Sequence, residues 1–465
     1  MTSSFLWWLR VAVIVAMAVH SSPVSTAAER APLRSKVFHS PPFTLSPGSV
    51  EGKYYGDIGF PRGHIALKDF RAELVDEAGN PVPLHDAYIH HWLVVRYYQR
   101  KRSGAAGPPR EPPESLITGN ASPSKGPPEY ILAGNAGTCE KILRQTFGLG
   151  SETRRTVTWV PDPYGIEVGN PAEVPAGYEE KWMMNVHAID TRGVVDRLGC
   201  IECRCEFYNV TVDESGRPLG KDYPGGVLCC HDKARCRTGE GSGGAPRKLF
   251  MRYEVKWLDW AAGIVPTKLY VLDVTDDGKR GPVASTDEFN DCQVEYHVAP
   301  CGREASGACI DSKRAFLVLP SGGNIVYAVA HQHRGGVGAA LYGQDGRTLC
   351  SSTPIYGRGE KAGDEAGYVV GMTTCYPSPG SVKVTSGERV TLISNYNATE
   401  PHSGVMGFFY ILVADPPEST VQLTGRLLHS NYFWVLLGGI TVASAVVVLY
   451  RRRREIGQRY QSLAL

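Results

Sequence analysis

The chain has 465 residues, enough for two or three domains, and a formal net charge of +2 from 49 basic and 47 acidic residues. This near balance favours no nucleic-acid partner, because nucleic-acid binding depends on an excess of positive charge. The 52 glycines and 32 prolines divide the chain into short segments of alternating polarity, and long amphipathic helical periods are absent. The composition therefore predicts an all-β fold.

The first 28 residues are predicted to be a cleaved signal peptide. An apolar run over Val11–Val19 is followed by the small-residue stretch VSTAA, the order typical of a secretory signal and its cleavage site. The mature chain is then expected in the secretory pathway or at the plasma membrane. Three glycosylation sequons agree with this compartment: Asn120, Asn209 and Asn397.

From residue 36 the chain reads as strands, for example in AYIHHWLVV and KLFMRYEVKWLDW. We expect two antiparallel β-sandwich, jelly-roll-like domains, over 36–282 and 288–416, with DVTDDGKRGPVASTDE as the linker between them. The Cys-rich stretch 200–236 is interpreted as an insertion in the first domain. A stalk, Pro416–Asn431, follows the second domain.

An uncharged stretch, 432–450, predicts one transmembrane helix, because nineteen helical residues span about 28 Å. The arginines at 451–454 follow at once and predict a cytoplasmic tail over 451–465, so the chain is expected to be a single-pass type I membrane protein. In that tail, YQSL at Tyr460–Leu463 fits the Y-x-x-apolar pattern that clathrin adaptors bind. A plain stop-transfer tail is the alternative.

All twelve cysteines lie between the signal peptide and the predicted span. An even number of cysteines in an oxidising compartment favours disulfides. The Cys-rich stretch also contains His231, so a zinc site is the alternative interpretation there, but the compartment favours disulfides over zinc.

Histidine pairs occur on two predicted strands. His331 and His333 are two residues apart, so on a strand their side chains share a face and can bind one metal ion. His90 and His91 are adjacent, so both reach one ion only if the strand bulges there. For each pair, polar residues on a solvated or mixed strand face are the alternative.

Two single residues complete the pattern. His187, in KWMMNVHAID, and Met406, in HSGVMGFFYILVAD, both lie among apolar strand residues, where core packing is the ordinary role. A thioether is nevertheless a soft ligand that selects Cu(I), and imidazole suits both copper oxidation states. His402, four residues before Met406, is an alternative ligand.

The order His-His, His, His-x-His, Met resembles the ligand order of the copper type II, ascorbate-dependent monooxygenases, the family of the peptidylglycine α-hydroxylating and dopamine β-hydroxylating enzymes. YGIEVGNPAEVPAGYEEKWMMNVHAID and AFLVLPSGGNIVYAVAHQHRGGVGAALYG are similar to segments of that family. The resemblance implies two copper ions facing each other across a solvent-filled cleft, with ascorbate as reductant. It places one ion on His90, His91 and His187, and the other on His331, His333 and Met406.

The departures from that family bear on the substrate. The arginine that binds a peptide carboxylate is Val329 here, and a family asparagine is Phe408, while the aromatic hydroxyl after the methionine is kept as Tyr410, the candidate catalytic residue. A peptide with a terminal carboxylate would lack its charge partner. The insertion 200–236 has no counterpart in that family and can cover or replace the cleft.

A closer resemblance, carried by KYYGDIGFPRGHIALKDFRAELVDEAGNPVPLHDAYIHHW, is to the plant stress up-regulated nodulin family. It implies no settled activity. Three functions therefore stay open: a membrane-tethered copper monooxygenase acting on a small-molecule or polymer substrate, a non-catalytic copper-binding module, and a stress-related cell-surface protein that binds other partners.

Overall fold

A computed structural model describes residues 32–101, 127–133, 146–241, 243–276, 292–302, 309–415, 443–454 and 456. Strands dominate it, which confirms the all-β prediction. In the first part of the chain the strands are β1 (Arg34–His39), β2 (Phe43–Leu45), β3 (Val50–Tyr55), β4 (Ile65–Asp76), β5 (Ala87–Arg100), β6 (Tyr130–Ala133), β7 (Phe147–Leu149), β8 (Tyr164–Val168), β9 (Tyr178–Asp190), β10 (Arg247–Asp259) and β11 (Val265–Asp273).

Twelve strands follow in the second part of the described chain. They are β12 (Tyr296–Val298), β13 (Ile310–Val318), β14 (Gly323–Gln332), β15 (Gly336–Tyr342), β16 (Thr348–Ser352), β17 (Pro354–Tyr356), β18 (Val369–Met372), β19 (Thr374–Cys375), β20 (Lys383–Val384), β21 (Arg389–Asn397), β22 (His402–Val405) and β23 (Gly407–Ala414). Three short helices interrupt the strands: the 3-10 helices η2 (Ser151–Arg154) and η3 (Cys205–Phe207), and α2 (Arg197–Ile201).

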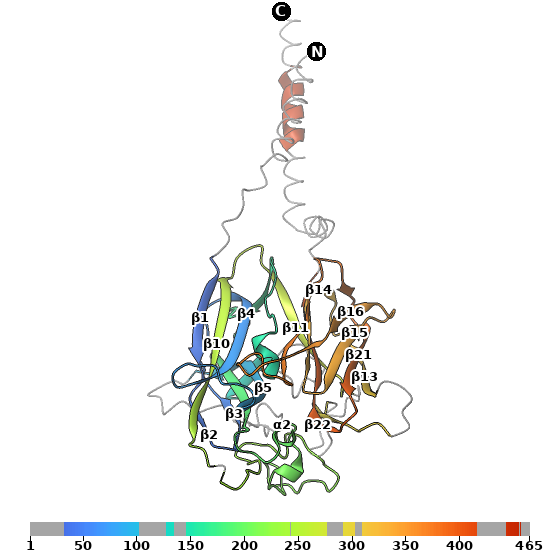
Figure 1. The fold of residues 1–465 in the computed structure, drawn as a ribbon. Coiled ribbons are helices and arrows are strands. Elements are labelled where there is room, and N and C mark those ends of the chain that lie inside the picture. The colour runs from blue at the N-terminus through green and yellow to red at the C-terminus, as the bar shows by residue number, and fades with distance from the viewer. Residues whose placement is uncertain are drawn as a thin grey trace, which may run out of the picture. The chain divides into compact units, whose positions relative to one another are not determined.

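One large sheet runs through both predicted sandwich regions. Its strand order is β1-β10-β4-β8-β11-β23-β14-β19, with β2 paired to β10 and β20 to β14. The chain's last strand in this unit, β23, lies between β11 and β14 and pairs antiparallel with both. Strands from 36–282 and from 288–416 are thereby hydrogen-bonded into one sheet, and the described residues up to Ala414 form one compact unit (Figure 1).

Two further sheets flank this one. The order β3-β9-β5-β6, with β7 on β5, makes a five-stranded sheet, and β13-β21-β15-β16 makes a four-stranded sheet. Every residue of β14 and of β23 is buried. A continuous apolar strand of this kind is typical of a sheet that is covered on both faces, whereas β13, which alternates between exposed and buried residues, is covered on one face.

The Cys-rich insertion is held by three disulfides, Cys200–Cys236, Cys203–Cys230 and Cys205–Cys229. The disulfide interpretation is therefore confirmed and the zinc alternative is wrong. Two more disulfides, Cys301–Cys309 and Cys350–Cys375, lie in the second part of the chain. In Figure 1 the insertion, which includes α2, lies near β3 and β22 at one end of the unit.

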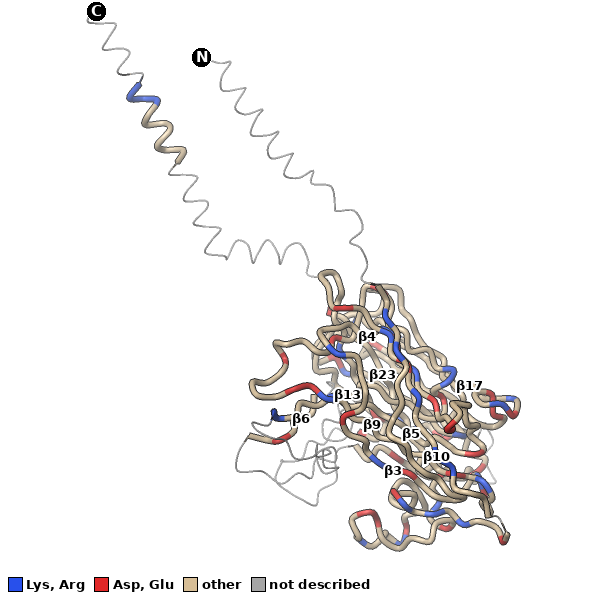
Figure 2. Tube along the Cα trace, turned by 90° about the vertical axis from the view of Figure 1, so that its left-hand side faces the viewer, with Lys and Arg blue, Asp and Glu red and all other residues tan. Residues whose placement is uncertain are grey.

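The second unit begins at Asp415, and its described part is a helix over 443–454 that ends in the four arginines (Figure 2). Among described residues, no helix combines the length and apolar character that crossing a bilayer requires. Most of the predicted span, 432–450, lies outside the described residues, as do the signal peptide and Tyr460–Leu463.

A buried carboxylate joins the insertion to the strand β12 region. Glu295 accepts a hydrogen bond of 2.9 Å from the backbone N–H of Val227, in the insertion, and its Oε1 atom is buried without a partner among the described residues. Burial raises the pKa of Glu295 from 4.5 to about 8. Between those two values the unfolded chain releases a proton that the folded chain retains, so stability falls as the pH rises through this window.

We expect Glu295→Gln to remove this pH dependence, since a neutral amide of the same shape keeps the hydrogen bond without the ionisable group. Between pH 5 and 8, the difference in unfolding free energy between the variant and the wild type should shift in favour of the variant by at most about 1.4 kcal/mol per pH unit. Urea unfolding at several pH values measures the difference. Glu77→Gln, at an exposed carboxylate, is the matched control, and parallel profiles for wild type and Glu295→Gln would contradict the assignment.

Candidate metal centre

His90, His91 and His187 are brought together by a bulge in β5. In the ladder of β5 with β9, Ile89 lies opposite Ala188 and His91 lies opposite His187, so His90 is an extra residue without a partner. The bulge that adjacent histidines need in order to face one ion is therefore present. One ligating nitrogen from each of the three rings lies within 4.8 Å of the others.

His331 and His333 lie at the end of β14 and are both buried. The next turn depends on Gly335, which has a φ of +87° and whose missing Cβ would lie 2.5 Å from His402 Nε2. The hydroxyl of Tyr396 accepts a hydrogen bond from the His333 N–H and donates one to the Met406 carbonyl, at 2.8 and 2.7 Å. The main chains of these two predicted ligands are thus tied to one side chain.

The two predicted sites form a single histidine cluster, which we define as His90, His91, His187, His331 and His333. The ring centroids of His90 and His333 are 4.4 Å apart, closer than His331 and His333 at 5.1 Å or His90 and His187 at 4.8 Å. The copper monooxygenase resemblance implies a solvent-filled cleft between the two sets. In the structure the sets are instead in contact through His90 and His333.

Three outer partners fix the orientation of three rings. His187 Nε2 donates to the Cys230 carbonyl at 2.8 Å, and His91 Nε2 donates to Asn185 Oδ1 at 3.0 Å. His331 Nδ1 donates to Glu152 Oε1 at 2.5 Å. Because each of these rings is then protonated on its outer nitrogen, the other nitrogen carries a lone pair, which is how metal-binding histidines are commonly held.

Several inner nitrogens of the cluster have no partner among the described residues. These buried atoms are His90 Nε2, His187 Nδ1 and His333 Nε2. Unpaired polar atoms are rare inside proteins because each loses its bonds to water. Three of them in one cluster are therefore nitrogens that could bind a ligand such as a metal ion.

Burial also keeps these rings neutral. It holds the pKa of His90, His91 and His333 well below the usual 6.5, and the positive charge of neighbouring imidazoles would lower them further. For His187, burial lowers the pKa to about 4. Neutral imidazole is the form that binds metal ions, so these nitrogens are available at neutral pH.

The remaining candidates lie around the cluster in different roles. Met406 is buried and is the single residue between β22 and β23. His402, the alternative ligand, uses both nitrogens elsewhere: Nδ1 contacts Glu202 Oε1 at 2.8 Å and Nε2 contacts the Asn397 carbonyl at 3.1 Å. The sulfurs of Cys203 and Cys230 lie near His187 but are bonded to each other, so they are not free to bind metal.

Tyr410 is one of the residues that line a cavity between β14, β23 and the strands of the first part of the chain. In the ladder of β14 with β23, Tyr410 lies opposite Val329, and His331 lies opposite Phe408, on which its ring stacks at 5.7 Å. Tyr410 and Val329 therefore line the same cavity, and Val329 is two residues from His331 on β14.

The residues that orient the rings were not identified from the sequence. Glu152 lies 179 residues before His331. It belongs to the 3-10 helix η2 and is fully buried. The Cys230 carbonyl belongs to the insertion. Every residue has a main-chain carbonyl, so the residue type gives no sign of this hydrogen bond. Asn185 did carry a signal: it is a polar residue two positions before His187 on an apolar strand, and so shares its face.

Comparison with solved structures gives low scores. The infectious bursal disease virus VP2 subviral particle matches at 10% identity over 84% of this chain and 74% of the other, with a TM-score of 0.18. A structure of the Gt strain of the same virus matches at 11% identity over 84% and 73%, with a TM-score of 0.17. Likenesses at these scores carry no argument about fold or function.

No curated protein sequence matches the chain. A family model does match, over residues 31–416, which include every strand of the first unit and the whole histidine cluster. Its description is stress up-regulated Nod 19. The chain therefore belongs to the stress up-regulated Nod 19 family.

Proposed function

We propose that this protein is a copper-binding, redox-active protein of the secretory pathway, and that its centre is the histidine cluster together with Met406. The observation that carries the proposal is a set of three buried imidazole nitrogens that have no partner among the described residues, in a cluster where three rings are oriented by hydrogen bonds on their outer nitrogens. The preferred activity is that of an ascorbate-dependent hydroxylating monooxygenase.

The donor set fits copper. Five imidazoles serve Cu(I) and Cu(II) alike, and the thioether of Met406 favours Cu(I). In this proposal two sandwich regions, 36–282 and 288–416, supply three ligands each: His90, His91 and His187 for one ion, and His331, His333 and Met406 for the other. Bound copper would supply one-electron chemistry with dioxygen, and ascorbate would be the reductant.

The chain's own residues orient and shield this centre. Glu152, Asn185 and the Cys230 carbonyl hold His331, His91 and His187 in one tautomer, so these three rings need not reorient to bind an ion. The insertion excludes water from the His187 side, because its disulfide Cys203–Cys230 packs there. Tyr410 lies opposite Val329 in the ladder of β14 with β23, two residues from the position of His331, and would be the hydroxyl near the reacting substrate.

We expect the copper-loaded protein to bind two copper ions per chain, and the double variant His331→Ala with His333→Ala to bind one. The reason is that each set of three ligands loses its ion when two of them are removed. Metal analysis after gel filtration measures the stoichiometry.

His64→Ala is the matched control, since His64 pairs with Glu167 on the surface and stacks on Trp260, away from the histidine cluster. It should keep both ions. A wild-type protein that binds no copper, or one ion only, contradicts the two-ion proposal.

Glu152→Gln should weaken copper binding at the His331 and His333 set by about 10- to 100-fold, because the charge-assisted hydrogen bond that orients His331 becomes a weaker neutral one. Competition with a chromogenic copper chelator measures the affinity. Glu167→Gln alters the same kind of His–Glu pair at His64, 2.7 Å long and partly exposed, and should leave copper affinity unchanged. Equal affinity in wild type and Glu152→Gln would remove Glu152 from the centre.

Burial supports a second candidate function, a copper-binding module that does not hydroxylate. His90, His187, His331 and His333 are each at most 4% exposed, and the rings of the two sets touch, so a large substrate has little access. Oxygen uptake by the copper-loaded protein that depends on ascorbate distinguishes the monooxygenase from this module. Copper binding without such uptake would favour the module.

We further propose that the protein is anchored in the membrane by residues 432–450, with 1–28 removed and 451–465 in the cytoplasm, where a clathrin adaptor binds Tyr460–Leu463. The disulfides support an oxidising compartment for residues 200–375, and the arginines support a cytoplasmic tail.

Protease added to intact cells should therefore spare an epitope tag placed after Leu465, since the membrane shields it. A tag placed between residues 28 and 36 should be cleaved in the same experiment, and immunoblotting of both tags reads out the result. Cleavage of the C-terminal tag in unbroken cells would overturn this orientation.

A further inference from the structure

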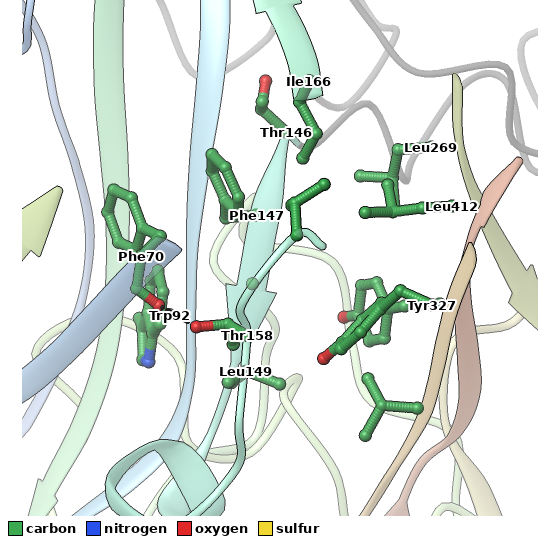
Figure 3. A pocket seen from close by; sticks show the side chains of 14 residues that line it. Phe70, Trp92, Thr146, Phe147, Leu149, Thr158, Ile166, Leu269, Tyr327 and Leu412 are labelled. Carbon is green, nitrogen blue, oxygen red and sulfur yellow. Dashed lines mark hydrogen bonds between the residues drawn. The ribbon is translucent and has the colours of Figure 1, made fainter. Parts of the chain in front are cut away.

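An apolar cavity of about 50 Å³ lies between the strands of the first and second parts of the chain. Figure 3 shows Phe70 of β4 and Trp92 of β5 on one side, and Leu269 of β11, Leu412 of β23 and Tyr327 of β14 on the other. It is partly open, one of its lining residues is Val329, two residues before His331, and no step of the proposed copper binding uses it.

The chemistry of the lining excludes charged ligands. Among the fourteen residues that line the cavity none is acidic or basic. Two of the hydroxyls in the lining already have partners: Thr158 donates to Asp69 Oδ1 at 2.7 Å, and Tyr327 donates to the Val157 carbonyl at 3.0 Å. The buried Trp92 Nε1 is a donor without a partner among the described residues.

The volume sets the size of the occupant. An apolar cavity of roughly 150 Å³ binds benzene or xenon and stays free of water, because a water molecule needs two to four polar partners. At about one third of that volume, this cavity fits a molecule of a few heavy atoms at most.

The position points to the histidine cluster. Val329 lines the cavity and precedes His331 by two residues on β14, about 7 Å along a strand on the same face. Leu149 also lines it, and the next residue, Gly150, lies so close to His331 that an added Cβ would come within 3.0 Å of His331 Cε1. A small molecule in the cavity is therefore one side chain away from His331.

We propose that this cavity is a binding site for a small, uncharged, apolar molecule of the size of dioxygen, and that it holds dioxygen beside the histidine cluster. The site takes a diatomic gas because its lining is apolar and its volume is small, and it holds the gas near His331 because Val329 and Leu149 lie beside both. The identity of dioxygen rests on the proposed function, whereas the binding of a small apolar molecule does not need a metal.

Xenon and dioxygen are the probes, used on the full chain purified without metal. Xenon should shift the methyl signals of Val329 and Leu412 in a saturable manner in NMR spectra. Dissolved dioxygen, which is paramagnetic, should shorten the relaxation times of those methyls at least twofold more than those of Leu341 and Leu392, which are equally buried in the four-stranded sheet.

Filling variants test the location. Val329→Phe should abolish the xenon shift of Leu412, and Leu412→Phe should abolish that of Val329, so that one informative variant remains if the other fails to fold. Ala328→Val, the matched control, adds bulk at the neighbouring buried residue on the opposite face of β14 and should leave xenon binding intact. Thermal unfolding verifies that each variant is folded.

Absence of a saturable xenon shift in the wild type, or a shift that survives both filling variants, overturns the proposal. Saturable xenon binding with equal oxygen relaxation at all four methyls rejects dioxygen as the occupant. Copper stoichiometry is read separately. If the protein binds xenon but no copper, the cavity proposal stands and the proposed function fails. If it binds copper but no xenon, the proposed function stands and the cavity proposal fails.

Discussion

The position of β23 between β11 and β14 is the constraint on which the candidate centre depends. Its ladders run from Phe408 to Ala414 on one side and from Gly407 to Ala414 on the other. Through these ladders the histidines of β14 are held in register with strands that come from the first part of the chain. Because side chains on a strand alternate between faces, a slip of one residue would turn His331 away from Glu152 and from the cavity.

Collecting five imidazoles in a buried cluster is unfavourable unless their polar atoms are bonded. The fold meets part of this requirement with outer hydrogen bonds from three separate elements: β9 supplies Asn185, the insertion supplies the Cys230 carbonyl, and η2 supplies Glu152. Three inner nitrogens have no partner among the described residues. The insertion and η2, which contribute no strand to the described sheets, thus each supply a hydrogen bond to the buried cluster.

Much of the fold and the candidate ligands could be predicted from the sequence, because both follow from local patterns. Alternating apolar residues identify strands, and the spacing of His331 and His333 places them on one face. For the adjacent pair His90 and His91 the sequence only makes a bulge the condition for sharing one ion, and the structure contains that bulge in β5. Long-range contacts have no such local pattern. Nothing in the sequence near Glu152 indicates that it will contact His331, and the sequence does not indicate how far apart the two histidine sets lie in the fold. Their contact follows from the β11–β23–β14 pairing.

The disulfide between Cys203 and Cys230 ties the maturation of the centre to the compartment in which it forms. Cys230 contributes its sulfur to this bond and its carbonyl to the hydrogen bond with His187 Nε2. The position of that carbonyl is therefore set in part by a covalent bond, and the orientation of the His187 ring depends on it. A change in the redox state of the insertion would reach this ring through a single residue, Cys230.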